Sequence, residues 1–383
     1  MIVEPAEIEP GLTLLGKIAR VNWVLMFLII ILSLIGLINL YSVGGGSLYP
    51  WVIPQLQKFA FGIVLMLGIA LVPVSFWQAS SYYIYFLGLI LLVLVEIIGV
   101  RLMGAQRWLD LGIVQIQPSE IMKVVMVMAI ANYYSRIDPT KVSNPLYLIF
   151  PLVLILLPVS LVFLQPDLGT AILLLFGGGI ILFVSGVSLY YFMGVLLVFI
   201  GTIGAVLFSR GTSWQLLQDY QFRRIDTFLD PNSDPLGNGY QIIQSKIAIG
   251  SGGITGKGFL NGTQTQLNFF PEKHTDFIFP VLAEEFGLFW SLIILILFLG
   301  FVIVCLYEAI KVRDRFSSFL IIGLAGTFFL YFTVNLAMVT GLFPVVGIPL
   351  PLISYGGSAL LSLMISFGFI QSAIIHDEKE KLT

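Results

Sequence analysis

Long apolar runs separated by short polar connections dominate the chain, and this pattern predicts a bundle of membrane-spanning helices. A spanning helix needs about 20 predominantly apolar residues. Runs of this kind lie at 22–42, 58–75, 82–100, 118–135, 146–164, 170–186, 188–208, 277–308, 316–341 and 352–375. We therefore expect an all-α integral membrane protein with about ten transmembrane helices, in which residues 1–383 form a single polytopic domain.

The composition supports lipid as the solvent for most of the surface. The chain is 58% hydrophobic and 10% charged, whereas a soluble domain has about 45–50% apolar and about 25% charged residues. A net charge of −2 excludes a basic nucleic-acid-binding protein. The single cysteine, Cys305, excludes an intrachain disulfide, and together with His274 and His376 it gives too few ligands for a usual zinc site. We predict no metal-ligating residues.

Lysine and arginine residues in the short connections predict the orientation of the bundle. If the N-terminus lies inside, the cytoplasmic segments hold nine basic residues: Lys17, Arg20, Arg136, Lys141, Lys311, Arg313, Arg315, Lys379 and Lys381. The short outer loops hold three, namely Lys58, Arg101 and Arg107. Because basic residues gather on the cytoplasmic side of membrane proteins, we expect both termini to be cytoplasmic.

Two segments depart from the regular pattern. Residues 209–276 form a long polar loop that this topology places outside, and the aromatic residues threaded through it indicate short ordered helices packed on the bundle. Residues 341–359 are apolar but contain three prolines and four glycines, which a straight helix does not tolerate. Irregular backbone at membrane depth is stable only where protein buries it or water lines it. We expect this second segment to re-enter the bundle near a cavity.

Charged residues inside the apolar runs are candidates for function, because each costs about 2.5–3.5 kcal/mol at the bilayer centre. Glu120 and Lys123 are three residues apart and share one helix face. Glu120 alone is also explained by ordinary helix-start chemistry, since it follows Pro118 near the positive end of the helix dipole. Lys123 lies a turn deeper and needs a partner. Glu284 and Glu285 lie two turns into the eighth run, and we expect neither to face lipid.

Asp276 stands where the long polar loop meets the eighth apolar run. An aspartate at this position is favoured as a helix N-cap for hydrogen-bonding reasons alone. A helix N-terminus also stabilises an ionised carboxylate, as a general base requires. The glycine run at 250–258 leaves two interpretations open in the same way, because its backbone amides could bind pyrophosphate or form a surface turn.

Five blocks of sequence together resemble the SEDS proteins (shape, elongation, division and sporulation). They are GAQRWLDLG (104–112), IQPSEIMK (116–123), QPDLGTA (165–171), the stretch from FLDPNSDPLGNGY to FFPEKHTDFIF (228–279) and GIPLPLISYGGS (347–358). The likeness runs from about residue 20 to 375. The stretch GTQTQLNFFPE is more similar to the members that act in cell elongation than to those that act in division.

The resemblance implies a peptidoglycan glycosyltransferase that polymerises lipid II into β-1,4-linked strands for rod shape. The 4-hydroxyl of the acceptor GlcNAc attacks the anomeric carbon of the donor MurNAc with inversion, and undecaprenyl pyrophosphate leaves. Asp276 matches the essential aspartate of the family and would be the general base. Glu120 and Lys123 match a buried ion pair beside it, and Trp108 matches an outer-loop residue tied to activity.

Positive charge is expected to stabilise the leaving pyrophosphate, and the sequence does not choose its source. The candidate substrate-binding residues are Trp108, Arg101, Arg107, Arg210, Arg223, Lys246, Lys257, Lys273 and His274. A divalent cation (Mg²⁺ or Mn²⁺) at the pyrophosphate is the other source, and no further cofactor is expected.

The resemblance also implies a place and partners: the bacterial cytoplasmic membrane with the active site facing outward, a class B penicillin-binding protein as transpeptidase, and other membrane proteins of the elongation complex. Two alternatives stay open, a flippase for lipid II and a non-catalytic scaffold for the penicillin-binding protein. Intramembrane charges and the broken segment 341–359 also suit a transporter. The informative residues gather at the outer face rather than the midplane, and this favours the polymerase.

Overall fold

The computed structural model describes residues 13–377 except 103–104, 111, 113–114, 213, 217–218, 235–237, 268 and 270–271. Lys379 and Lys381, which contributed to the predicted orientation, lie outside the described residues.

Each of the ten apolar runs forms a helix. These are α2 (Trp23–Val43), α3 (Val52–Leu71), α4 (Val74–Ile98), α5 (Pro118–Ser135), α6 (Pro145–Leu164), α7 (Leu168–Val184), α8 (Leu189–Ser209), α12 (Ile278–Lys311), α13 (Arg315–Val339) and α14 (Ser358–Ile375). Within the described chain, eight are long and apolar enough to cross a membrane. The other two are α7, which is shorter, and α5, which carries Glu120 and Lys123. The predicted all-α membrane architecture is confirmed.

Three helix starts differ from the prediction. Helix α14 begins at Ser358 rather than 352, because the proline-rich segment before it stays irregular. Helices α3 and α4 begin earlier than predicted, at Val52 and Val74. The first turns of α3 are polar, but Gln55 there is buried and donates to the main-chain oxygen of Ser354 at 3.2 Å. The placement of Lys58 in an outer loop was therefore wrong, since it lies inside α3.

The connections contain smaller elements. Residues between α4 and α5 form a three-stranded antiparallel sheet in the order β1 (Val100–Leu102), β2 (Ala105–Asp110), β3 (Gln115–Ile116), which the sequence did not predict. The long polar loop contains α9 (Asp219–Leu229), η2 (Pro231–Ser233), α10 (Asn238–Ser251) and α11 (Thr263–Gln266), so the predicted short helices are present. The opposite end of the bundle has α1 (Leu14–Ala19) and η1 (Pro139–Lys141).

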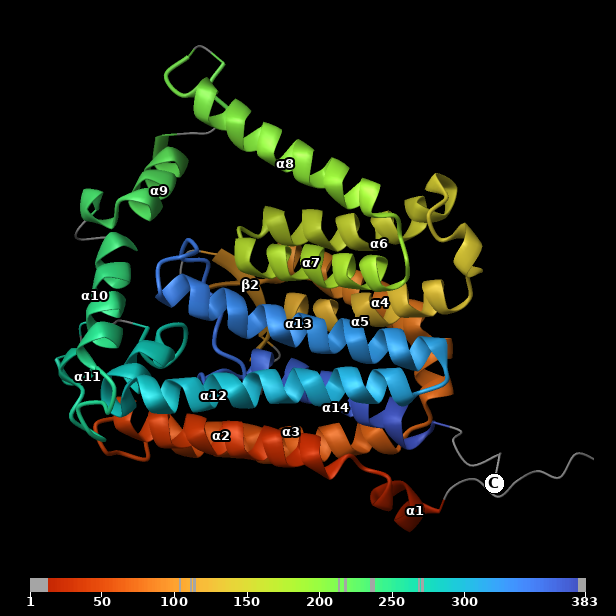
Figure 1. The fold of residues 1–383 in the computed structure, drawn as a ribbon, viewed down its shortest axis with the longest axis horizontal. Helices are drawn as coiled ribbons and strands as arrows, with labels where there is room; N and C mark the ends of the chain where they lie inside the picture. Colours follow the sequence, from red (N-terminus) through yellow and green to blue (C-terminus); the bar gives the residue numbers. More distant parts are fainter. Residues whose placement is uncertain are drawn as a thin grey trace, which may run out of the picture.

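Helix α5 lies at the centre of the bundle and is buried along most of its length (Figure 1). Helix α8 lies at the edge, and Ser209 is the one buried residue described within it. An apolar helix exposed all round is stable only in lipid. From the end of α8 the chain returns through α9 to α10, which packs on α12 and α13.

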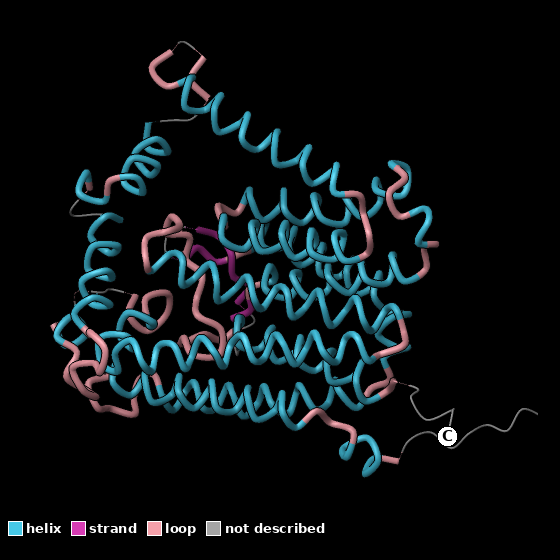
Figure 2. Tube along the Cα trace, viewed as in Figure 1, coloured by secondary structure: helices cyan, strands magenta, loops and turns pink. Residues whose placement is uncertain are grey.

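The two ends of the bundle differ in structure. The strands, α10 and α11 gather at one end, while α1 lies at the other (Figure 2). At the α1 end, the main-chain nitrogen of Asn22 donates to the Gln371 side chain at 2.9 Å, and Ser372 donates to the main-chain oxygen of Val72 at 2.7 Å. These hydrogen bonds join the beginning of α2 and the end of α3 to the end of α14. The irregular segments that carry the candidate residues therefore share the opposite end.

Candidate active site

Asp276 is held by its backbone at the polar end of the bundle. It lies one residue before Phe277, the N-cap of α12, and no side-chain cap hydrogen bond is formed at the start of this helix among the described residues. The main-chain oxygen of Asp276 accepts from Asn335 Nδ2 of α13 at 2.9 Å. The preceding residue, Thr275, accepts at its main-chain oxygen from Ser354 Oγ at 2.6 Å. The N-cap interpretation of Asp276 is therefore not supported, and the carboxyl group is left available for chemistry.

The electrostatic environment of Asp276 suits a proton acceptor. Burial of the carboxyl group raises its pKa to about 7, with smaller contributions from the negative charges of Glu272 and Asp167, while Arg107 acts in the opposite direction. General bases work best when their pKa lies near the operating pH, because they are then both deprotonated and basic enough. A carboxyl group with the ordinary pKa of an aspartate would be a much weaker base.

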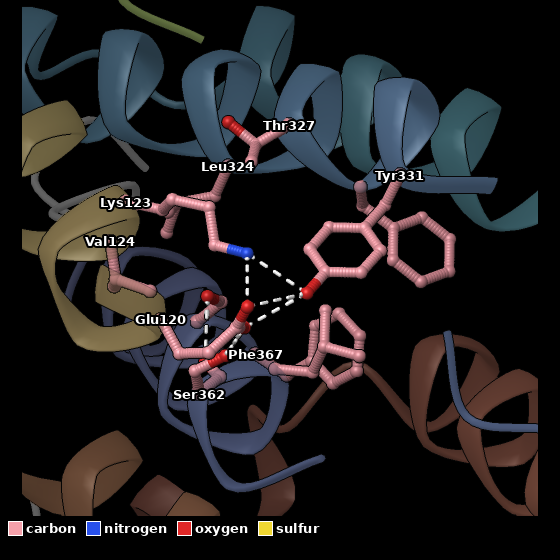
Figure 3. A pocket seen from close by; sticks show the side chains of 11 residues that line it. Glu120, Lys123, Val124, Leu324, Thr327, Tyr331, Ser362 and Phe367 are labelled. Atoms are coloured by element: carbon pink, nitrogen blue, oxygen red, sulfur yellow. Dashed lines mark hydrogen bonds and ion pairs between the residues drawn. The ribbon is translucent and has the colours of Figure 1, made fainter. Parts of the chain in front are cut away.

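Glu120, Lys123 and Tyr331 form a closed network beneath this region (Figure 3). Lys123 Nζ lies 2.7 Å from Glu120 Oε1 and donates to the Tyr331 hydroxyl at 2.8 Å. The Tyr331 hydroxyl donates to the Glu120 carboxylate, and Ser362 Oγ donates to the same carboxylate at 3.1 Å. Glu120 is 4% exposed and Lys123 3%. Both charges are thus paired inside the bundle, beside a cavity of about 20 Å³ that they help to line.

Helix α13 connects this network to Asp276. Tyr331 and Asn335 are one turn apart on it, and they lie on the same face. Asn335 Nδ2 donates both to Asp276 and to the main-chain oxygen of Ile348, the latter at 2.6 Å. The ion pair therefore reaches Asp276 through α13, with no direct hydrogen bond between them among the described residues.

Arg107 and Asp167 form a second polar group near Asp276. Arg107, on β2, donates to the main-chain oxygens of Gln165 and Pro166, and its Nη1 lies 3.9 Å from Asp167 Oδ1. Asp167 also caps α7 through the Thr170 main-chain nitrogen at 3.3 Å. The QPDLGTA block named above contains Asp167, although this residue was not itself among the candidate site residues. Both side chains act on Asp276 electrostatically.

The remaining candidate substrate-binding residues divide into separate environments. Trp108 is partly buried in β2 opposite Val100. His274 lies two residues from Asp276 and stacks on Trp51 with 3.9 Å between ring centroids. Lys246 on α10 lies beside Gly341 at the end of α13. The side chains of Arg101 and Arg223 lie outside the described residues.

Three of the candidate cations already have partners. Arg210 forms two hydrogen bonds to Asp226, at 2.8 and 2.7 Å. Lys257 Nζ lies 2.6 Å from Glu284 Oε1. Lys273 donates to the main-chain oxygen of Thr265 at 3.0 Å, and burial lowers its pKa. Arg210 and Lys257 are thus neutralised by carboxylates, so the structure favours neither as a source of positive charge for a leaving group.

The glycine run 250–258 pairs with a break in α12. Gly287 has a φ of +74° and interrupts the helix, which leaves carbonyl and amide groups on either side without helical partners. The main-chain nitrogen of Lys257 donates to the main-chain oxygen of Glu284, and that of Gly258 to the main-chain oxygen of Glu285, each at 3.0 Å. Of the amides in this run, those of Lys257 and Gly258 are occupied by α12 and are not available to bind pyrophosphate. Glu284 and Glu285 are both buried, as the sequence predicted.

Comparisons with known proteins agree with this arrangement. The model of the cell cycle protein family FtsW, RodA and SpoVE matches residues 17–379. The chain is 46% identical over 330 residues to the peptidoglycan glycosyltransferase MrdB of Escherichia coli (strain K12), covering 86% of each. It is 35% identical over 317 residues to a probable peptidoglycan glycosyltransferase FtsW of Buchnera aphidicola, covering 82% of this chain and 87% of that one.

Solved structures share the fold. A chain of a structure titled "Structural coordination of polymerization and crosslinking by a peptidoglycan synthase complex" is 30% identical with a TM-score of 0.78, covering 94% of this chain and 99% of that one. The rod shape determining protein RodA of Thermus thermophilus is 25% identical with a TM-score of 0.68, covering 94% and 98%. The family model spans nearly the whole chain, and the matched residues include Glu120, Lys123 and Asp276. The chain belongs to the FtsW, RodA and SpoVE family of cell cycle proteins.

Proposed function

We propose that the protein is a peptidoglycan glycosyltransferase that polymerises lipid II for cell elongation. The observation that carries the proposal is the position of Asp276, a carboxyl group at the polar end of a membrane bundle whose pKa burial raises to about 7. The 46% identity to a relative named as such an enzyme supports the reaction class.

The reaction needs one base rather than the two carboxylates of a glycosidase. The 4-hydroxyl oxygen of the acceptor sugar forms a bond to the anomeric carbon of the donor, and its proton passes to the Asp276 carboxylate. The bond between that carbon and the pyrophosphate oxygen breaks, and undecaprenyl pyrophosphate leaves with the electron pair. Because this leaving group departs as an anion, it needs no proton from a second acid, unlike a sugar leaving group. A positioned base contributes about 10²–10⁴ in rate.

Glu120 and Lys123 serve in this proposal as positioning residues. They do not reach the outer surface, but they fix Tyr331 and thereby the face of α13 that carries Asn335. Asn335 in turn holds the backbone of Asp276. Removing either charge would leave its partner buried and unpaired, which is costly, and would disturb α13 where it supports the base.

Arg107 is the predicted cation best placed to act on substrate near Asp276. It lies within electrostatic range of that carboxyl group and is partly exposed. A divalent cation bound to the pyrophosphate would be a second source of positive charge. Among the described residues no group of three His, Cys, Asp or Glu side chains is arranged to hold one, so phosphate oxygens of the substrate would supply most of its ligands.

The proposed setting is the bacterial cytoplasmic membrane, with both termini cytoplasmic and the Asp276 end outside. The structural similarity to a chain from a peptidoglycan synthase complex supports a transpeptidase partner, which we propose is a class B penicillin-binding protein. Other membrane proteins of the elongation complex would contact the same bundle.

Incubation of the purified protein with lipid II tests the function directly. We expect glycan polymer from the wild type and almost none from Asp276→Asn. Movement of lipid II across liposomes without polymer would instead identify a flippase. A protein that neither makes polymer nor moves lipid II, but still binds the transpeptidase, would be identified as a scaffold.

A further inference from the structure

Lys58 is a charged residue inside a helix long and apolar enough to span a membrane, and the site described above does not use it. It lies inside α3, about 9 Å along the helix from Val52. No carboxylate of the described residues lies within ion-pair distance of its ammonium group. Charged residues within membrane helices normally pair with one another or line a functional site. A lysine in such a helix with no carboxylate partner among the described residues therefore indicates a place for an anion.

Two neighbours fix the Lys58 side chain. Its ammonium nitrogen lies 4.0 Å from the centroid of the Tyr355 ring, a cation–π contact. A Cβ atom built on Gly357 would lie 3.9 Å from the same nitrogen, so the ammonium group passes close to the backbone there. Neither neighbour neutralises the charge. The ammonium group is thus held in position while its positive charge remains available.

The segment that holds Lys58 also encloses Asp276. A Cβ atom on Gly347 would lie 3.5 Å from Asp276 Oδ2, and ten residues later the same segment reaches Lys58 at Gly357. Between these points the main-chain nitrogen of Tyr355 donates to the main-chain oxygen of His274 at 2.9 Å. Lys58 and Asp276 are therefore fixed relative to each other by one stretch of backbone.

An aromatic stack reinforces this connection from the side of α3. Trp51, at the start of α3, stacks on His274 and makes an edge contact with Tyr355 at 5.0 Å between centroids. The three rings come from three separate parts of the chain. Their packing ties the first turns of α3, and with them Lys58, to the residues that precede Asp276.

The position selects the kind of anion. A soluble anion loses its hydration when it enters a membrane helix bundle. The phosphate groups of a lipid, in contrast, already lie at the boundary between the membrane and water. We propose that Lys58 binds the pyrophosphate of a lipid-linked sugar and that Tyr355 holds the ammonium group for this contact. The identity of the lipid rests on the proposed function. Arg210 and Lys257 do not compete for this role, since each is paired with a carboxylate.

Binding measurements with two lipids test the site independently of catalysis. The probes are undecaprenyl pyrophosphate, which carries the anion, and undecaprenol, which does not. Loss of a hydrogen bond to a charged group corresponds to about a ten- to hundredfold change in binding. We expect Lys58→Gln to weaken binding of undecaprenyl pyrophosphate by this factor and to leave undecaprenol unchanged. Lys58→Arg should bind both lipids nearly as the wild type does.

Lys141→Gln is the matched control, because this exposed lysine of η1 lies outside the proposed site. Tyr355→Leu gives a second test if Lys58→Gln does not fold. It keeps the ammonium group but removes the ring, and we expect about a two- to thirtyfold loss of undecaprenyl pyrophosphate binding. Unchanged binding in the folded variants, or an equal loss for both lipids, would overturn the proposal.

The two proposals fail separately. A wild-type protein that makes no glycan, yet binds undecaprenyl pyrophosphate through Lys58, would overturn the proposed function and leave this site intact. A wild-type protein that polymerises lipid II, with Lys58→Gln binding undecaprenyl pyrophosphate normally, would overturn the site alone.

Discussion

Asn335 donates its side-chain amide to the main-chain oxygen of Asp276 at 2.9 Å and to that of Ile348 at 2.6 Å. One buried side chain on α13 thus joins the residue that precedes α12 to the irregular segment that re-enters the bundle. Asp276 and the segment that faces it are positioned by the same amide group.

Asn335→Leu should lower the polymerisation rate although Asp276 is unchanged. The substitution keeps a similar branched shape but removes the donor from one buried and one partly buried carbonyl oxygen, at about 1–3 kcal/mol each. The measurements are the rate with lipid II and its pH profile. Because the base itself is retained, the midpoint of the profile should stay near that of the wild type while the maximum rate falls. An unchanged maximum rate in a folded variant would show that this amide does not position the base.

Glu120→Ala and Lys123→Ala should each reduce both stability and activity strongly. Breaking a buried ion pair by removing one partner costs about 3–5 kcal/mol, because the other charge is stranded. The double variant should lose less than the sum of the two single losses, since it strands neither charge. Thermal unfolding and polymerisation rates of the three variants form the cycle. Additive losses would contradict the pairing as a functional unit.

Much of this architecture could be predicted from the sequence, because a membrane imposes helix length and apolar composition together. The start of α3 was missed for the same reason. Gln55 and Lys58 are polar, so a rule based on apolar runs began the helix only at Lys58 and excluded Gln55. Yet Gln55 bonds to the main-chain oxygen of Ser354, and Lys58 contacts Tyr355. The sheet β1–β3 is too short and too polar to leave a periodic signal.

The candidate site was predicted only where charge marked it. Glu120 and Lys123 stood out by their cost in lipid and Asp276 by its place where the polar loop meets a helix, whereas Tyr331 and Asn335 did not stand out. Both carry polar groups inside the run 316–341 and therefore need partners, so a signal was present. Which partners they find depends on the packing of α13 against α5 and on the irregular segment, and spacing along the chain cannot give that.

Lys257 should act as a structural residue rather than a phosphate ligand. Its ammonium group, the Thr263 hydroxyl and the Gln264 main-chain nitrogen donate to Glu284, which is 0% exposed. Lys257→Met would remove the positive partner of that buried carboxylate. We expect a loss of about 3–5 kcal/mol in stability. Glu284→Gln, which keeps a hydrogen-bond acceptor and removes the charge, should restore part of the stability when combined with Lys257→Met. Thermal unfolding of the two single variants and the double variant measures this, and the absence of any restoration would contradict the ion pair.

The predicted orientation can be tested with introduced cysteines in a Cys305→Ser background. Ile254 is 73% exposed in the polar loop, and Arg313 lies between α12 and α13 at the opposite end. An impermeant thiol reagent should label Ile254→Cys in intact cells and Arg313→Cys only after lysis. The reverse pattern would place the Asp276 end in the cytoplasm and remove access to lipid-linked sugars on the outer face.

Asp276→Asn should abolish glycan synthesis and at the same time stabilise the folded protein. As a base, Asp276 must be deprotonated, so the wild-type rate should rise with pH through about 7, and the variant should make almost no glycan at any pH. Folding raises the pKa of this group from 3.8 to about 7, so the folded protein retains a proton that the unfolded chain releases. Ionisation of this carboxyl group therefore lowers the free energy of unfolding. The loss grows as pH rises from about 4 to about 7 and stays constant above about 7. Asparagine carries no charge and avoids this cost.

The apparent unfolding temperature of Asp276→Asn should consequently exceed that of the wild type, and by more at pH 8 than at pH 5. Lipid II polymerisation over the same pH range provides the second measurement. A residue with a purely structural role would give the opposite result, a variant that is less stable and loses activity in proportion. Near-wild-type polymer from Asp276→Asn would remove the base assignment, and an equal stability gain at both pH values would show that the carboxyl group is not desolvated in the folded protein.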